Sequence, residues 1–279
     1  FTSTSAVCVT GLTVLDTAKD YTMLGKSIIL ILIQVGGIGI MTFTSFFGYF
    51  FKGSTSSFSE KFVLSDFLNE DNVSEIAKTL MKVIFITLLI ELIGASIIFF
   101  SLDTQFFPTI EKRIHFSVFH AISAFCNAGF STLSFNLYDV TVSQSLGVIY
   151  TISFLIIFGG IGFPILLNIY TFLKLKISRI VIILLRRFKQ DVRPQIININ
   201  TKLVVVTTLF LLVVGTVMFF LLEKENTLAG MTLSQKIAHS FMGSVTPRTA
   251  GFNSVDYTRI SVATAVLTIF LMWVGASPV

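Results

Sequence analysis

Long uncharged stretches dominate this chain, and they decide the solvent in which it can fold. Five stretches are long and apolar enough to cross a membrane, at about residues 27–51, 80–101, 145–173, 203–222 and 260–277. A helix needs roughly 20 residues to cross the hydrocarbon core of a bilayer. Charged residues make up only 13% of the chain, about half their share in a typical soluble domain. We therefore predict an all-α integral membrane protein.

Two shorter apolar stretches, at about residues 114–125 and 233–245, interrupt this pattern. Each would cover only about 18 Å as a helix. Each contains a histidine, His120 or His239, and each is followed by a polar turn that contains a glycine. This combination is typical of a re-entrant helix, which enters the membrane and returns on the same side. We predict that neither stretch crosses the membrane.

The distribution of positive charge predicts which connectors are cytoplasmic. Eight of the 20 basic residues lie between Lys174 and Lys202. If the short helices do not cross, residues 52–79 and 174–202 share one side of the membrane. Since cytoplasmic loops carry an excess of Lys and Arg, we predict that both connectors are cytoplasmic and contact lipid. The sequence shows no basic pattern interleaved with aromatic residues, so the net charge of +5 does not indicate nucleic-acid binding.

A glycine turn recurs three times. It reads "CVTGL" at residues 8–12, "CNAGF" at residues 126–130 and "RTAGF" at residues 248–252. Each copy precedes a spanning stretch with a second shared element: "QVGGIGI" from Gln34, "FGGIGFP" from Phe158 and "WVGASPV" from Trp273. Taken alone, such glycines most simply permit close helix packing. Three copies in register favour a repeated unit of span, short helix, glycine turn and span.

This unit divides the chain into three repeats and two connectors. We predict repeat 1 at residues 1–51, a cytoplasmic connector at 52–79, repeat 2 at 80–173, a basic cytoplasmic connector at 174–202 and repeat 3 at 203–279.

Non-helical backbone within a membrane persists only where it is buried in protein or lines a path filled with water. Repeating such a turn around an axis places rings of carbonyl oxygens that can replace the water around a monovalent cation. The partially negative C-terminal ends of the short helices would favour that cation. Asp139 and Asp256 follow their turns at a distance, and we expect them to be solvated loop residues.

The segments "HAISAFCNAGFST" (residues 120–132), "SVTPRTAGFNSVD" (244–256) and "TSAVCVTGLTVLDT" (4–17) resemble the TrkH/KtrB superfamily of potassium-translocating membrane subunits. The resemblance implies tandem span–pore helix–span repeats around a pseudo-fourfold ion pore, with three of the four repeats wholly or partly present. The first span of repeat 1 and all of repeat 4 would then be missing. We therefore expect that this chain does not conduct by itself.

By this resemblance, backbone carbonyls of nine residues form the selectivity filter and bind potassium: Val9, Thr10, Gly11, Asn127, Ala128, Gly129, Thr249, Ala250 and Gly251. The resemblance also assigns Gly275, Ala276, Ser277 and Pro278 to the start of a gating loop, and Pro278 suits an interruption of the helix. Potassium is the only metal ion expected, at the filter.

The resemblance further implies potassium uptake down an electrochemical gradient, without catalysis, in the inner membrane of a bacterium. It implies a homodimer whose cytoplasmic face binds a ring of nucleotide-binding regulatory subunits. It leaves room for stimulation by sodium, and no cofactor is expected in this chain.

Two other classes of function remain open. A broken-helix transporter coupled to sodium or protons would need inverted repeats and an acid near the midplane; these repeats run parallel, and only Glu91 qualifies. A membrane scaffold or sensor would explain the glycines as packing residues, but not three registered turns. An enzyme is disfavoured because the sequence shows no nucleophile–base pair or metal-ligand pattern.

Several polar residues within apolar segments have more than one interpretation. We expect Cys8 and Cys126 to be free thiols near the filter entrance, because they occupy equivalent positions in different repeats. We expect the two histidines to serve helix packing. Glu91 suits a functional role or a structural one equally well. For Arg248 we expect that it anchors its pore helix rather than repelling cations.

Overall fold

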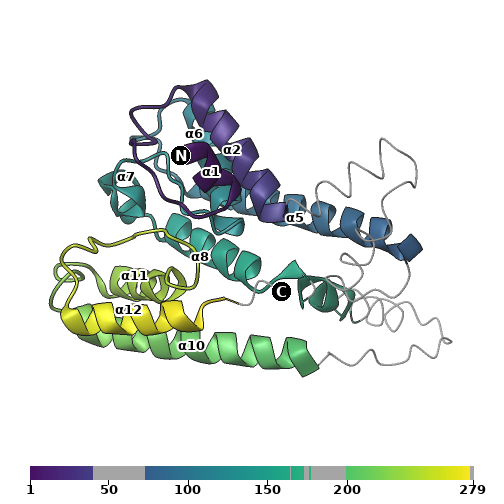
Figure 1. Cartoon of the computed structure of the whole chain (residues 1–279). Coiled ribbons are helices and arrows are strands. Elements are labelled where there is room, and N and C mark those ends of the chain that lie inside the picture. Colours follow the sequence, from purple (N-terminus) through teal and green to yellow (C-terminus); the bar gives the residue numbers. More distant parts are fainter. Residues whose placement is uncertain (40–72, 164, 173–175, 177–198, 277–279) are drawn as a thin grey trace, which may run out of the picture.

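The computed structural model describes residues 1–39, 73–163, 165–172, 176 and 199–276. Within these ranges every regular element is helical, which confirms the all-α prediction (Figure 1). The elements are α1 (Thr2–Val7), α2 (Met23–Ile38), α5 (Val73–Ser101), α6 (Ile110–Phe125), the 3-10 helix η1 (Asn136–Tyr138), α7 (Val140–Ser143), α8 (Leu146–Gly160), α10 (Ile199–Glu223), α11 (Leu233–Val245) and α12 (Val262–Val274).

Two helices of the described chain are long and apolar enough to cross a membrane without a break. They are Met81–Ser101 within α5 and Thr201–Glu223 within α10. Both confirm stretches that the sequence predicts as spans. The outer face of α10 exposes large apolar side chains, among them Leu209, Phe210 and Val213, as expected of a surface in contact with lipid.

The predicted span at 145–173 is bent in the structure. α8 ends at Gly160, and the helical segment Ile165–Phe172 is bent by 105° relative to it. Gly162, between the two, has a φ of +90°, which lies outside the helical region and is readily adopted only by glycine. The pair has the geometry of a broken span or of a re-entrant loop.

The two remaining predicted spans, at 260–277 and 27–51, correspond to α12 and α2, and the described helices have other bounds than predicted. α12 covers 13 residues rather than the predicted 260–277, and it ends where Gly275 takes a φ of +65°. This end agrees with the expected interruption of the helix. α2 begins at Met23, where the side chain of Thr22 caps its first turn, and its described part ends at Ile38. Residues 40–51, residues 52–72 of the predicted connector 52–79 and most of the basic connector lie outside the described residues. The last part of the first connector is described and is helical, because α5 already begins at Val73.

Both predicted short helices are present. α11 matches its prediction and begins with a capping box formed by Thr232 and Gln235. α6 begins at Ile110, four residues before the predicted 114. The prediction started too late because the first turn of the helix contains polar residues such as Glu111, and the predicted stretch was defined by apolar residues. At 16 residues, α6 would cover about 24 Å.

The short helices occupy the interior of the helix arrangement. α6 packs against α5 and α8 of its own repeat and against α2 of the preceding one. α11 likewise packs against α10 and against α8 of the preceding repeat (Figure 1). Each short helix is therefore held by two consecutive repeats, which brings the glycine turns that follow α1, α6 and α11 into one region.

Candidate functional site

The three glycine turns share one backbone conformation. We call residues 9–11 turn 1, residues 127–129 turn 2 and residues 249–251 turn 3. In each turn the first and third residues have a positive φ, and the middle one does not: the values are 54° and 73° for Val9 and Gly11, 56° and 71° for Asn127 and Gly129, and 75° and 76° for Thr249 and Gly251. A positive φ is uncommon outside glycine, so the repeat in the sequence is also a repeat in the backbone.

This alternation of φ orients the peptide groups. In an extended strand, successive residues face opposite sides. An alternation of right- and left-handed residues instead turns successive N–H groups to one side, and the carbonyl oxygens then turn to the other. Each turn can therefore present consecutive carbonyls in one direction.

The turns lie side by side, backbone against backbone. A Cβ atom on Gly11 would lie 2.5 Å from the carbonyl oxygen of Ala128. On Gly129 it would lie 2.8 Å from the carbonyl oxygen of Ala250 and 3.1 Å from the Cα of Gly251. Turn 1 thus meets turn 2, and turn 2 meets turn 3, with no room for a side chain between them. The sequence-predicted carbonyl residues are brought together.

Hydrogen bonds and buried rings fix turns 2 and 3 to the protein interior. The amide of Ala128 donates to the carbonyl of Ser123 at 2.8 Å. The hydroxyl of Ser123 donates to the carbonyl of Phe130 at 2.8 Å, and the hydroxyl of Thr246 donates to the carbonyl of Phe252. The side chains of both phenylalanines are fully buried. These contacts hold turns 2 and 3 against the ends of α6 and α11.

The glycine-containing elements in the spans, which begin at Gln34 and Phe158, allow close helix packing, and this is the simplest interpretation of their glycines. A Cβ on Gly36 would overlap the carbonyl of Val7, and a Cβ on Gly159 would overlap the carbonyl of Phe125. In both repeats the second span therefore lies directly against the C-terminal end of the short helix. Close packing therefore explains Gly36 and Gly159, but it does not explain the conformation shared by the three turns.

The histidines and cysteines have structural surroundings. His120 is buried, with Nδ1 2.9 Å from the carbonyl oxygen of Phe116 and Nε2 2.9 Å from the hydroxyl of Ser131. Nε2 of His239 lies 3.1 Å from the carbonyl oxygen of Ser143. Both cysteines are free thiols, as expected. Across the described residues, no three His, Cys, Asp or Glu side chains are placed to hold a metal ion.

Glu91 lies beside turn 2, on α5, and is 4% exposed. Its Oε1 accepts from the thiol of Cys126 at 3.9 Å, and its Oε2 has no hydrogen-bond partner among the described residues. Cys126 also packs against Gly37 of α2. Cys126 therefore fills the contact between α2, α5 and the end of α6, whereas Cys8 is exposed.

Replacing Glu91 tests which of its two interpretations holds. We expect Glu91→Gln in the full-length protein to retain potassium uptake, because an amide oxygen can still accept from Cys126. Glu91→Leu should lower the yield of folded protein, because the thiol loses its acceptor. The measurement is uptake per folded molecule, with folded protein quantified by size-exclusion chromatography. Equal loss of uptake in folded Gln and Leu variants would instead require an ionisable group at this position.

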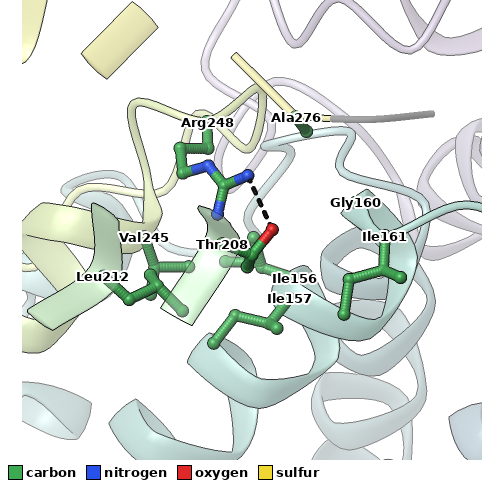
Figure 2. A pocket seen from close by; sticks show the side chains of 9 residues that line it. All are labelled: Ile156, Ile157, Gly160, Ile161, Thr208, Leu212, Val245, Arg248 and Ala276. Atoms are coloured by element: carbon green, nitrogen blue, oxygen red, sulfur yellow. Dashed lines mark hydrogen bonds between the residues drawn. The ribbon is translucent and has the colours of Figure 1, made fainter. Parts of the chain in front are cut away.

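The side chain of Arg248, just after the C-terminal end of α11, binds groups on α10 and at the end of α12, which suits the predicted anchoring of its pore helix. Its Nε donates to the carbonyl of Gly275 at 2.9 Å. A terminal guanidinium nitrogen donates to the hydroxyl of Thr208 at 3.2 Å, and Figure 2 shows this second bond. It thus anchors α12 and α10 to turn 3. Of the predicted gating loop, Gly275 and Ala276 are described, whereas Ser277 and Pro278 lie outside the described residues.

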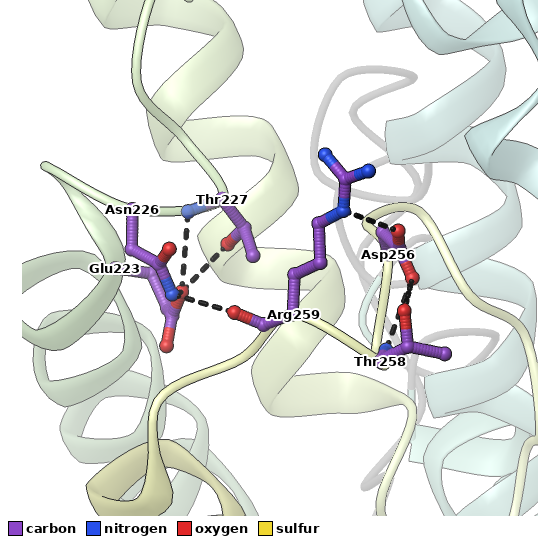
Figure 3. A network of polar contacts seen from close by, with 6 residues as sticks. All are labelled: Glu223, Asn226, Thr227, Asp256, Thr258 and Arg259. Carbon is purple, nitrogen blue, oxygen red and sulfur yellow. Dashed lines mark hydrogen bonds and ion pairs between the residues drawn. The ribbon is translucent and has the colours of Figure 1, made fainter.

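The acidic loop residues adopt similar turns. Asp139 accepts from the amide and hydroxyl of Thr141, and Asp256 accepts from the same groups of Thr258. The hydroxyl of Thr258 is the main cause of a lowered pKa at Asp256. Asp256 also pairs with Arg259 at 3.3 Å (Figure 3). These contacts agree with the expectation of loop residues.

Sequence reasoning missed Glu223, a fully buried carboxylate at the end of α10. Its Oε2 accepts from Asn226 and Thr227 just beyond the helix (Figure 3). Its Oε1 accepts from the amide of Ser261 at 2.8 Å and the hydroxyl of Thr264 at 2.5 Å. The only signal in the sequence is that Glu223 is the first charged residue after an apolar stretch. The contacts tie the end of α10 to the start of α12.

Comparison with known proteins gives this site a context. The family model described as TrkH, cation transport protein, matches residues 1–279. The chain is 36% identical to the potassium/sodium uptake protein NtpJ of Enterococcus hirae, over 99% of this chain and 56% of that protein. It is 36% identical to the Ktr system potassium uptake protein B of Bacillus subtilis, over 99% of this chain and 57% of that protein. It is 33% identical to the protein of the same name from Vibrio alginolyticus, over 99% of this chain and 56% of that protein.

The chain therefore spans slightly more than half the length of these relatives. The match covers every described helix and all three glycine turns. The family consists of membrane transporters rather than enzymes. This chain belongs to the TrkH family of cation transport proteins.

Proposed function

We propose that this chain forms three sides of a potassium pathway and that backbone carbonyls of its three turns coordinate the ion. The proposal rests on one observation: turns 1, 2 and 3 share the same alternation of φ and lie backbone against backbone. Carbonyl oxygens in rings can replace the hydration shell of a potassium ion. The filter residues are then Val9, Thr10 and Gly11, Asn127, Ala128 and Gly129, and Thr249, Ala250 and Gly251.

The chemistry of the turns favours a monovalent cation. None of their nine residues has an acidic side chain that could form a charged ring for divalent ions. The C-terminal ends of α6 and α11 lead directly into turns 2 and 3, where their partial negative charge favours a cation. Relatives of the chain are named as potassium or potassium/sodium uptake proteins, which supports the same cargo here.

The remaining features of the proposal follow the family. The chain beyond Gly275 would form a gating loop below the filter. The protein would act as a homodimer in the inner membrane of a bacterium, with a cytoplasmic ring of nucleotide-binding subunits. Sodium would stimulate uptake, and no cofactor would be needed.

Complementation tests the proposed function. The full-length gene is expressed in a bacterium that lacks its own potassium uptake systems. We expect growth at low external potassium together with rubidium uptake into the cells. If folded protein reaches the membrane but neither growth nor uptake is restored, with its regulatory subunit co-expressed, the proposal is wrong.

A further inference from the structure

A deep apolar groove lies between α8 and α10. α11 packs against both of these helices, which have little direct contact with each other. The cavity between them has a volume of about 600 Å³ and is lined by side chains of all three helices, among them Phe158, Leu209, Val213 and Phe241. Phe158, Leu209 and Val213 are at the same time exposed at the surface. The groove is therefore open to whatever surrounds the helices.

The lining of the groove suits an apolar occupant. Of the described residues that line it, only Thr208 and Thr216 are polar. The hydroxyl of Thr216 donates to the carbonyl of Leu212 at 2.6 Å, and the hydroxyl of Thr208 accepts from Arg248. Cavities with such walls do not hold water well. If the groove stayed empty, its walls would lose dispersion contacts, so we expect hydrocarbon to fill it.

The length of the groove matches one leaflet of a bilayer. The residues of α10 that line it extend from Val205 to Val217, which is about 18 Å along a helix. One leaflet contributes about 15 Å of hydrocarbon, half of the core of a typical bilayer. α10 spans the membrane from Thr201, so the groove begins about one turn inside this end of the span. A single acyl chain that enters from this end would fill the groove.

The end of the groove near Val205 has positive charge on both walls. Lys202 lies one turn before Val205 on α10 and is exposed. On the other wall, Ile169 lines the groove, and the chain beyond it continues to Lys176, which is also exposed. No acidic residue occurs in 165–172, at 176 or in 199–222. Basic sites between spanning helices on the cytoplasmic side suit anionic lipid headgroups, and this end adjoins the connector predicted as cytoplasmic.

We propose that an anionic phospholipid of the cytoplasmic leaflet binds here, with one acyl chain between α8 and α10 and its headgroup at Lys202. This site lies outside the potassium pathway and does not depend on it. Thr208 and Leu212 line both the groove and the small cavity beside Arg248 (Figure 2). The acyl chain would therefore keep water from the bond between Arg248 and Thr208, and such bonds are stronger where water is excluded.

Native mass spectrometry of the full-length protein tests the preference for an anionic headgroup. Protein stripped of lipid is titrated with phosphatidylglycerol or with phosphatidylcholine of the same acyl chains. We expect tighter binding of phosphatidylglycerol. Lys202→Gln should weaken that binding about fivefold, the effect of one lysine at an anionic surface, and leave phosphatidylcholine binding unchanged. Lys224→Gln is the matched control, because Lys224 lies just beyond the opposite end of α10. Equal binding of the two lipids would overturn the proposal.

A bulky side chain in the groove tests the position of the acyl chain. Val213→Trp fills part of the groove, whereas Val206→Trp makes the same change at an exposed position of α10 that does not line it. We expect Val213→Trp to lower the affinity for phosphatidylglycerol at least tenfold and Val206→Trp to leave it unchanged. Equal affinities of the two folded tryptophan variants would contradict an acyl chain in the groove.

Phosphatidylglycerol with a photoreactive group on its acyl chain locates the lipid without any substitution. We expect labelling of Phe158 and Leu209 in the full-length protein in vesicles. Equal labelling of Phe210, which is exposed on α10 outside the groove, would mean ordinary surrounding lipid and would overturn the proposal. Absence of label from the groove would mean that protein covers it, either the rest of the full-length chain or a second copy, and would overturn it too. If Val213→Trp does not fold, this labelling pattern decides.

Discussion

Replacing Gly129 with serine in the full-length protein is expected to lower the preference for potassium over sodium by roughly tenfold or more. Gly129 has a φ of +71°, and a Cβ there would lie 2.8 Å from the carbonyl oxygen of Ala250. The left-handed conformation alone costs a residue with a side chain about 1–2 kcal/mol. The contact must in addition displace a carbonyl of turn 3, which would itself be a ligand. The measurement is the ratio of rubidium to sodium uptake in reconstituted vesicles.

The chain offers a matched control for this substitution in Gly230. That glycine has a similar φ of +80°, but a Cβ there would meet no atom of the described residues within 4 Å. Gly230→Ser therefore carries the same conformational cost without the contact, and we expect it to retain the wild-type ion preference. A Gly129→Ser protein that folds and keeps its preference would show that turn 2 does not coordinate the ion.

Replacing Glu223 with alanine is expected to destabilise the protein by about 3 kcal/mol or more, because it leaves several donors without their charged acceptor. Glu223 is fully buried and accepts hydrogen bonds from groups beyond α10 and at the start of α12. Among these are the amide of Ser261 and the hydroxyl of Thr264, neither of which would reach water readily. The thermal unfolding midpoint in detergent, followed by size-exclusion chromatography, measures the effect.

Glu225 provides the comparison for Glu223. It lies two residues away, its side chain is 87% exposed, and it pairs with Lys224 at 3.4 Å. Since exposed ion pairs contribute little to stability, Glu225→Ala should leave the unfolding midpoint nearly unchanged. Equal midpoints for the two alanine variants would mean that the Glu223 contacts do not hold α10 to α12.

Features encoded within a few neighbouring residues could be predicted from the sequence. The two uninterrupted spans, the short helix α11 and the three glycine turns all depend on local hydrophobicity or on glycine. The sequence also predicts that Val9, Asn127 and Thr249 belong to the turns, because each lies two residues before the glycine of its turn. That they themselves take a positive φ could not be predicted, since none of them is glycine.

Features that join distant segments could not be predicted. The partners of Arg248 lie 27 and 40 residues away, and Glu223 meets Ser261 38 residues further along. No periodicity or motif marks such pairs, because each depends on how whole helices pack. The bend after α8 was missed for another reason: the glycines of "FGGIGFP" have a simpler interpretation as packing residues, whereas Gly162 takes a positive φ at the bend.

The most direct test of the account is to locate the ion itself. Crystals of the full-length protein grown in rubidium allow the anomalous signal of that ion to be mapped. We predict peaks on the axis enclosed by turns 1, 2 and 3, within coordinating distance of the carbonyl oxygens of residues 9–11, 127–129 and 249–251. A strong peak elsewhere, for example beside the carboxylate of Glu91, with none between the turns, would contradict the central claim.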